Sequence, residues 1–343
     1  MTNSIEYHLK MKGIVRYVSD CEVVFTRGPH IWISDDCGNS IRKLPILPTS
    51  VSSKFLNSFR LVRRLLRSDV SNIKVLSSTS KVVMAHDNIY RYDADNEWMY
   101  CSSIVGHRPL FLMRTPTDHL FYGEYRANAE RSPVSVWCSA DSGETWRPAW
   151  TFDNVRHIHG VFYDSYTESI WVTTGDDNEE CGLWITRDNF ANLDLVVGGT
   201  QQQRAIQLLF TKRYVYFGTD SPLEINQICR LDRKTNKIEI LQSVSGSVFY
   251  GCKVNDNLFF STAVEPSVVN KSRYACLWGS PDGYKWKCLT KYRKDIWPMK
   301  LFQYGQIIFP AGDNQTRKLW FTPWATEYDQ TIQCIDVTKI DWD

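Results

Sequence analysis

The sequence predicts an all-β fold, a single β-propeller of seven four-stranded blades that takes up residues 1–343 as one domain. The first observation is a series of short runs rich in β-branched and aromatic residues, such as EVVFTR, SIWVTTGD and YVYFGTD, bounded by Asp, Asn, Gly or Pro. The second is a repeat of about 47 residues, the size of one propeller blade. Dividing the 343 residues by this repeat gives about seven blades.

A short motif carries the repeat. Its clearest copy, Ser139 to Trp146 (SADSGETW), fits the pattern S-x-D-x-G-x-x-W, known as the Asp-box. Weaker copies begin at Ser34, Thr186 and Ser280, and the aspartates of the four copies are Asp36, Asp141, Asp188 and Asp282. These aspartates are 105, 47 and 94 residues apart, close to two, one and two repeats. We expect turns in which Asp accepts backbone N–H groups, Gly has a positive φ and Trp packs between sheets.

On these motifs the chain resembles the Asp-box (BNR-repeat) β-propeller superfamily, which includes sialidases, other glycoside hydrolases and non-enzymatic sugar or protein binders. The resemblance implies that the boxes connect the third and fourth strands of a blade, away from the active face. Asp141 and Asp282 are therefore not catalytic candidates. The Arg-Ile-Pro segment of sialidases is not found, so the resemblance implies a sialidase-like or glycoside hydrolase-like protein rather than a clear sialidase.

One segment departs from the β pattern. The run from about Ser53 to Arg67 (SKFLNSFRLVRRLLR) has helix-like or mixed periodicity. We expect a local helical insertion whose basic face lies in solvent.

Composition excludes several classes of function. The 40 Lys and Arg nearly balance the 38 Asp and Glu, and no basic run is interleaved with aromatics, which argues against nucleic acid as a partner. No apolar stretch approaches the roughly 20 residues of a membrane span, and the start MTNSIEYHLKMKG lacks a signal-peptide core. The ten cysteines are scattered without metal-finger spacing, as expected for reduced thiols. We therefore expect a cytoplasmic protein, of undetermined oligomeric state.

The box positions set the phase of the predicted blades. Innermost strands are expected near Leu110–Arg114, His157–Tyr163, Ala205–Phe210, Val248–Lys253 and Met299–Gln303. Second strands are expected near His119–Tyr125, Ser169–Gly175, Tyr214–Thr219, Asn257–Thr262 and Gln306–Pro310. In a propeller, the loop that enters an innermost strand and the loop that leaves a second strand open on the same end of the channel. Polar residues at these two places should converge.

Acidic residues follow the second strands, and basic or aromatic residues precede or begin the innermost ones. The acids are Glu124, Asp176, Asp177, Asp220, Glu224, Glu265 and Asp313. The residues at the strand entries are Arg156, His157, His159, Arg204, Lys294, Asp295, Trp297 and Lys300. Turn chemistry alone favours Asp at strand ends, but Glu124, between Gly123 and Tyr125, is a poor turn former.

This pattern predicts a glycoside hydrolase, in which one carboxylic acid protonates the leaving oxygen and a second carboxylate attacks or activates water. Glu124 is the first candidate for acid–base catalysis, with Asp177 or Glu265 as its partner. Substrate contacts are expected from Arg156, Arg204, Asp220, Glu224, Trp297 and Lys300.

His157 and His159 are two residues apart, so both side chains of a regular strand face one side. They could supply acid–base catalysis or substrate contact, bind a metal, or lie in the core. A divalent metal at this pair is the one cofactor that the sequence leaves open.

The arginines predict the substrate. A guanidinium binds a carboxylate through two parallel hydrogen bonds, so Arg156 and Arg204, with Lys294 and Lys300, favour an acidic glycan. Inside a cell, such an enzyme would assemble or edit a bacterial surface polysaccharide. Two alternatives stay open: a polysaccharide lyase on the same face, and a propeller that binds a glycan or protein without catalysis.

Overall fold

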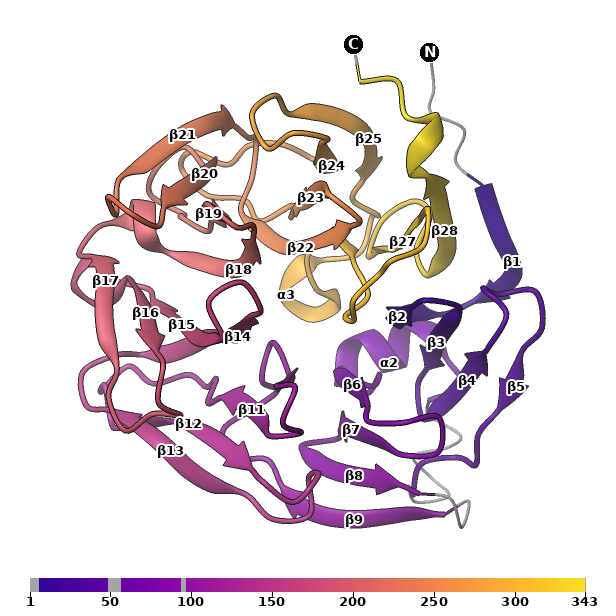
Figure 1. Ribbon diagram of the computed structural model, residues 1–343. Helices are drawn as coiled ribbons and strands as arrows, with labels where there is room; N and C mark the ends of the chain where they lie inside the picture. Colours follow the sequence, from indigo (N-terminus) through magenta and orange to yellow (C-terminus); the bar gives the residue numbers. More distant parts are fainter. Residues whose placement is uncertain (1–5, 49–56, 94–96, 343) are drawn as a thin grey trace. The chain divides into compact units, whose positions relative to one another are not determined.

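The computed structural model describes residues 6–48, 57–93 and 97–342 (Figure 1). Within these ranges, hydrogen bonding organises the chain into seven four-stranded antiparallel sheets. Six sheets contain four consecutive strands each, and the seventh is completed by the N-terminal strand. The fold is therefore the seven-bladed β-propeller that the sequence predicts. No helix in these ranges has the length and hydropathy needed to cross a bilayer.

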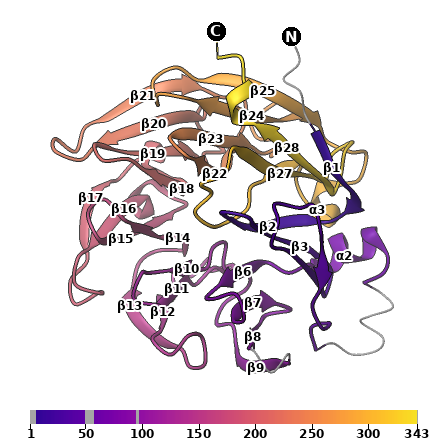
Figure 2. The ribbon, with the colours of Figure 1, turned by 45° about the vertical axis from the view of Figure 1, so that its right-hand side comes forward.

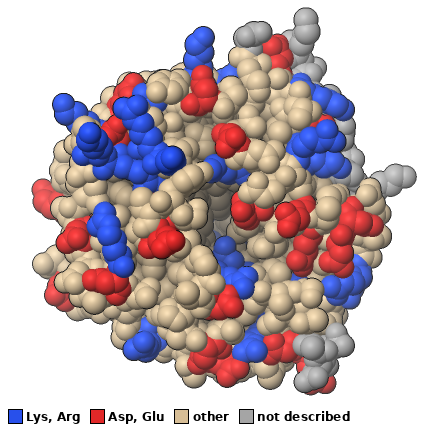
Figure 3. Space-filling view, in the orientation of Figure 1, with Lys and Arg blue, Asp and Glu red and all other residues tan. Residues whose placement is uncertain are grey.

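The chain divides into two compact units. The first comprises residues 1–70, 95–98 and 245–343, and the second comprises residues 71–94 and 99–244. On the face drawn in Figure 3, acidic and basic side chains are interspersed, in keeping with a formal net charge of +2.

The second unit contains four sheets. Their strands are β6 (Asn72–Val75), β7 (Lys81–Ala85), β8 (Asn88–Tyr92) and β9 (Trp98–Ser103); β10 (Met113–Arg114), β11 (Leu120–Gly123), β12 (Val134–Ser139) and β13 (Arg147–Phe152); β14 (His157–Asp164), β15 (Ser169–Gly175), β16 (Gly182–Thr186) and β17 (Asp194–Gly198); and β18 (Ala205–Phe210), β19 (Tyr214–Thr219), β20 (Gln227–Asp232) and β21 (Ile238–Ser243). Short 3₁₀ turns, η1 (Asn178–Glu180) and η2 (Gln201–Gln203), precede β16 and β18.

The first unit contains three sheets and two helices. The strands are β2 (Ile14–Ser19), β3 (Glu22–Arg27), β4 (His30–Ser34) and β5 (Arg42–Lys43); β22 (Val248–Val254), β23 (Asn257–Thr262), β24 (Tyr274–Ser280) and β25 (Lys287–Arg293); and β26 (Gln306–Ile308), β27 (Lys318–Trp324), β28 (Thr331–Asp336) and β1 (Glu6–Lys12). The helices are α2 (Arg60–Leu66) and α3 (Met299–Phe302), and a 3₁₀ turn, η3 (Val337–Lys339), follows β28.

The last sheet joins opposite ends of the chain. Strand β1 pairs antiparallel with β28, and the two lie side by side in Figure 2. Glu6 lies opposite Cys334. The outermost strand of this blade therefore comes from the N-terminal segment, while its three inner strands come from residues 306–336.

Apolar side chains fill the space between neighbouring sheets. Between the second and third sheets of the second unit, Val136, Phe152, Ile158 and Val172 belong to one buried cluster. A Cβ on Gly160 would lie 2.2 Å from the ring of Phe162 in the same strand and 3.2 Å from the Ile206 carbonyl oxygen of β18. Only glycine fits there without displacing its neighbours.

All four Asp-box turns connect the third and fourth strands of their sheets, as expected. In the clearest copy, Ser139 Oγ donates to Asp141 Oδ1 at 2.7 Å and accepts from the Gly143 N–H at 2.8 Å. The Thr145 N–H donates to the same Asp141 oxygen at 2.9 Å. Gly143 has a φ of +93°, and the Trp146 indole donates to its carbonyl. The turn therefore has the geometry that the motif predicts.

We expect Asp141→Ala to lower the free energy of unfolding by about 1–2 kcal/mol in urea denaturation, because the turn loses its shared acceptor. Burial raises the pKa of Asp141, but hydrogen bonds from Thr145 outweigh it and lower the pKa overall. A carboxylate whose pKa is lower in the folded state than in the unfolded state stabilises the fold above about pH 4, and this stabilisation is lost as the pH falls further. The difference in free energy of unfolding between wild type and Asp141→Ala should therefore shrink in acid. Exposed Asp153→Ala is the control. An equal loss in both variants would contradict this role.

The phase predicted for the last blade is wrong. Met299–Phe302 is helix α3 rather than an innermost strand, and Gln306–Ile308 is innermost rather than second. Pro298 is the N-cap residue of this helix, which begins at Met299.

The predicted insertion is also partly corrected. Residues 53–56 lie outside the described part, and α2 covers the end of the predicted segment. Its arginines are not all solvated: Arg63 and Arg64 are buried. Arg63 contacts Asp69, and Arg64 contacts Asp295 and Asp329, so carboxylates compensate the buried charges.

Candidate functional site

The second unit brings several predicted residues together around one acid, Asp176, which directly follows β15. We call His157, His159, Asp176, Arg156 and Arg204 the Asp176 cluster. All five lie at the ends of β14, β15 and β18 or in the adjoining loops.

A β-bulge positions the two histidines. His157 lies opposite Gly175 and Ile158 opposite Thr174, but Gly160 lies opposite Thr173, so His159 is an extra residue in β14. Bulges redirect side chains, and here both imidazoles are buried and face each other. A Cβ on Gly175 would lie 3.2 Å from His159 Cε1, so glycine leaves room for this ring.

Backbone carbonyls fix the orientation of both rings. His157 Nδ1 lies 3.3 Å from the Arg126 carbonyl oxygen, and His159 Nδ1 lies 3.1 Å from that of Ala205. Carbonyl oxygens only accept, so each Nδ1 carries the hydrogen. The two Nε2 atoms then face each other 3.2 Å apart.

Asp176 completes the centre of the cluster. Its Oδ1 lies 3.3 Å from His157 Nε2, 3.5 Å from His159 Nε2 and 2.9 Å from Arg204 Nη2. Its Oδ2 lies 3.2 Å from Arg156 Nη1. Burial alone would raise the pKa of Asp176, but the imidazoles and the Arg204 charge lower it far below its usual range. Burial lowers the pKa of His159, which favours a neutral ring near pH 7.

Arg204 connects Asp176 to a second acid. Its Nε lies 3.5 Å from Asp220 Oδ2, and its Nη1 donates to the Asp176 carbonyl at 3.2 Å. Glu224, in the same loop as Asp220, is exposed, and its backbone N–H donates to Ser221 Oγ. The structure thus places Asp220 beside the cluster and Glu224 at the surface.

Glu124 is held within the protein. It is 5% exposed, its Oε1 lies 2.8 Å from Arg126 Nε, and its Oε2 accepts from the Ser135 N–H at 3.1 Å. Its neighbour Tyr125 reaches the cluster instead, with its ring centroid 4.2 Å from that of His157. Each Glu124 oxygen thus has a partner within the protein, and the catalytic role of this residue stays a prediction.

Asp177 has a different partner from Asp176. Its side chain is 65% exposed and pairs with Arg131, which also contacts Glu180. Glu180 in turn accepts from the Arg156 backbone N–H at 3.1 Å. Asp177 therefore lies at the surface, one residue from the centre of the cluster. Glu180 supports the loop that carries Arg156.

Three predicted site residues belong to the first unit and stay predictions. Glu265 accepts from Ser247 Oγ at 3.0 Å. The Trp297 ring lies 5.5 Å from that of Phe302, and its carbonyl accepts from Lys294 Nζ. Lys300 is exposed on α3.

Asp176 is the central residue that sequence reasoning did not select. Asp176 and Asp177 are adjacent aspartates that follow the same strand. Residue type alone does not show which of the two is buried. The available signal was its place directly after Gly175, opposite the predicted histidine pair.

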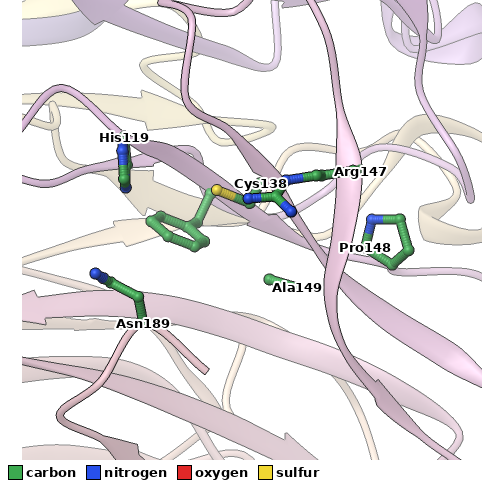
Figure 4. A pocket seen from close by; sticks show the side chains of 7 residues that line it. His119, Cys138, Arg147, Pro148, Ala149 and Asn189 are labelled. Carbon is green, nitrogen blue, oxygen red and sulfur yellow. The ribbon is translucent and has the colours of Figure 1, made fainter. Parts of the chain in front are cut away.

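A shallow pocket lies elsewhere in this unit, between β11–β13 and the box turn of the next sheet (Figure 4). Its lining residues are His119, Phe121, Cys138, Arg147, Pro148, Ala149 and Asn189. The lining includes no carboxylate and none of the predicted site residues.

Solved structures with a similar fold have different roles. YCF48 bound to a D1 peptide matches with a TM-score of 0.57 and 8% identity over 96% of this chain and 95% of that one. An ancestral GH74 enzyme matches with a TM-score of 0.61 and 12% identity, over 97% of this chain and 46% of that one. The extracellular domain of the putative one component system BT4673 from B. thetaiotaomicron matches with a TM-score of 0.60 and 13% identity, over 97% of this chain and 40% of that one.

The chain thus spans less than half the length of the last two proteins. At these identities the likeness shows the fold alone. No protein-family model matches the chain, and no curated protein matches its sequence.

Proposed function

We propose that this protein is a carbohydrate-active enzyme that cleaves an acidic glycan at the Asp176 cluster. The observation that carries the proposal is the convergence of two guanidinium groups on one carboxylate beside paired imidazoles. The Arg156 side chain is 38% exposed, and its contact with Asp176 is made through Nη1. Arg156 therefore has donors to offer a substrate carboxylate.

Elimination suits this cluster better than hydrolysis does. A uronate lyase needs cations that neutralise the sugar carboxylate and a group that accepts the neighbouring proton, and the cluster contains arginines and imidazoles together. The base removes the proton on the carbon next to the carboxylate, a C=C bond forms, the C–O bond to the next sugar breaks, and the leaving oxygen takes up a proton. The predicted hydrolase carboxylates Glu124 and Asp177 are instead held by different arginines.

Hydrolysis is the second candidate because Arg204 contacts two carboxylates, Asp176 and Asp220. A single guanidinium spans both, which brings their oxygens within the roughly 5–10 Å used by two-carboxylate glycosidases. A GH74 enzyme among the structural neighbours supports glycan chemistry on this fold, and a peptide-bound neighbour supports simple binding equally.

Ten free thiols support a role in a reducing compartment, where the enzyme would assemble or edit a bacterial surface polysaccharide.

The test is a panel of acidic and neutral bacterial polysaccharides, with ultraviolet absorbance and new reducing ends measured on each. Elimination gives a new ultraviolet-absorbing C=C bond, and hydrolysis gives reducing ends without it. Binding by calorimetry with neither product would overturn the enzyme proposal in favour of a binding propeller.

We expect Arg156→Ala to raise KM for the acidic glycan by about tenfold to a hundredfold, because a charge-assisted hydrogen bond to the substrate is lost. A carboxyl-reduced form of the same glycan cannot undergo elimination, so its Kd is measured by calorimetry and should equal that of wild type. Arg213→Ala, at a 71% exposed arginine of the same unit, is the matched control. An equal loss on both glycans would show that Arg156 only supports Asp176.

A further inference from the structure

The geometry points to a divalent transition-metal site formed by His157 Nε2, His159 Nε2 and Asp176 Oδ1. The three atoms form a nearly equilateral triangle with sides of 3.2, 3.3 and 3.5 Å. This inference stands apart from the proposed function, because metal binding is measured without any glycan.

The triangle has the size that a tetrahedral ion requires. Zn²⁺ binds imidazole nitrogen at about 2.0–2.1 Å and carboxylate oxygen at about 2.0–2.2 Å, so tetrahedral ligands lie roughly 3.3–3.5 Å from one another. The observed separations match this spacing. These separations therefore allow an ion to contact all three atoms at ordinary bond lengths.

The surroundings orient the ligands as metal sites do. Each histidine donates its Nδ1–H to a backbone carbonyl, of Arg126 or Ala205, which leaves the Nε2 lone pair for the ion. Arg156 contacts the other oxygen of Asp176 and so fixes the carboxylate. Such outer contacts are typical of histidine and carboxylate ligands.

Without a cation, the same arrangement is unfavourable. Two lone pairs and an anionic oxygen converge on one point in a buried place. Asp176 Oδ1 is shielded from solvent and lies 2.9 Å from Arg204 Nη2, which offsets part of its charge. The two facing Nε2 lone pairs gain nothing from that contact, and an ion on the triangle would bind all three atoms.

The donor set selects the class of metal. Two imidazoles and one carboxylate suit Zn²⁺ and neighbouring transition metals, whereas Mg²⁺ and Ca²⁺ prefer oxygen ligands.

The experiment is titration of chelator-stripped protein with Zn²⁺ by calorimetry, and with Co²⁺ by visible spectroscopy. We expect one tight site per chain, with the Co²⁺ spectrum of nitrogen and oxygen ligands and no thiolate charge-transfer band. His157→Ala and His159→Ala should each weaken binding at least a hundredfold, and Asp176→Asn should weaken it as well. His119→Ala and Cys181→Ser, in the same unit, should bind as wild type does.

Thermal unfolding verifies that each variant folds, and Gln replaces Ala at any histidine where it does not. Absence of stoichiometric binding to wild type would overturn the site. Tight binding that survives both histidine variants, or a thiolate spectrum lost in Cys181→Ser, would also overturn it. So would a ring-nitrogen NMR signature of a proton shared between the two Nε2 atoms that Zn²⁺ does not displace.

Discussion

Asp176→Asn is expected to lower kcat/KM for the acidic glycan by about a thousandfold or more while the protein stays folded. Asn preserves the shape of the side chain but removes the charge that Arg156, Arg204 and the imidazoles surround. The cluster then lacks the anion that orients its cations and rings. Steady-state kinetics on the cleaved polysaccharide measure the loss, and thermal unfolding measures the fold.

The neighbouring residue supplies a matched control for this variant. Asp177→Asn removes a carboxylate one position along, on a side chain that is 65% exposed, and should keep most of the activity. Glu124→Gln, in the same assay, tests the residue that the sequence favoured as acid–base catalyst. Equal activity in Asp176→Asn and wild type, with loss in Glu124→Gln, would return the catalytic role to Glu124.

The second large effect concerns stability in the first unit. Arg64→Met should lower the free energy of unfolding by about 2–4 kcal/mol, because Asp295 and Asp329 each lose a buried guanidinium and keep only Lys294 and Arg60 as cationic partners among the described residues. The Arg64 side chain is fully buried and contacts Asp295, Asp329 and the Phe302 carbonyl. Met fills the space of the alkyl stem but donates nothing to these groups. Chemical denaturation measures the difference.

Exposed Arg67→Met, on the same helix end, should cost less than about 0.5 kcal/mol. Arg64→Met combined with Asp295→Asn should recover part of the loss, because the double variant no longer buries a carboxylate that has lost its guanidinium. Similar losses in Arg64→Met and Arg67→Met would show that the ion pairs around α2 contribute nothing measurable.

Local sequence rules predicted much of the fold because four of the blades contain the same short turn motif. The box turn is made by residues within eight positions of one another, so its aspartates could set the phase of β14, β15, β18 and β19. The last described box lies before β25, and α3 intervenes before β26. Because no box marks the last blade, the sequence placed its innermost strand one element too early.

The site was harder to predict because it depends on partners that are distant in sequence. The bulge at His159 changes the direction in which the His159 ring points, and no residue type in the sequence predicts this bulge. The exposure of Asp176 and Asp177 differs because Arg131 holds one and Arg204 the other, from loops 46 and 28 residues away. Glu124 was a sound candidate by its flanking residues, but the Arg126 and Ser135 contacts that engage it appear only in three dimensions.

The pairing of β1 with β28 also has a consequence for synthesis on the ribosome. Glu6 is translated near the beginning of the chain and Cys334 near its end, yet the two lie opposite each other. At about 5–20 residues per second, the first strand waits roughly 15–65 s for its partner. During that time its edge is open to other nascent chains. We therefore expect the closing pair to be the last native sheet contact to form, and the stage at which translation speed and chaperones most affect yield.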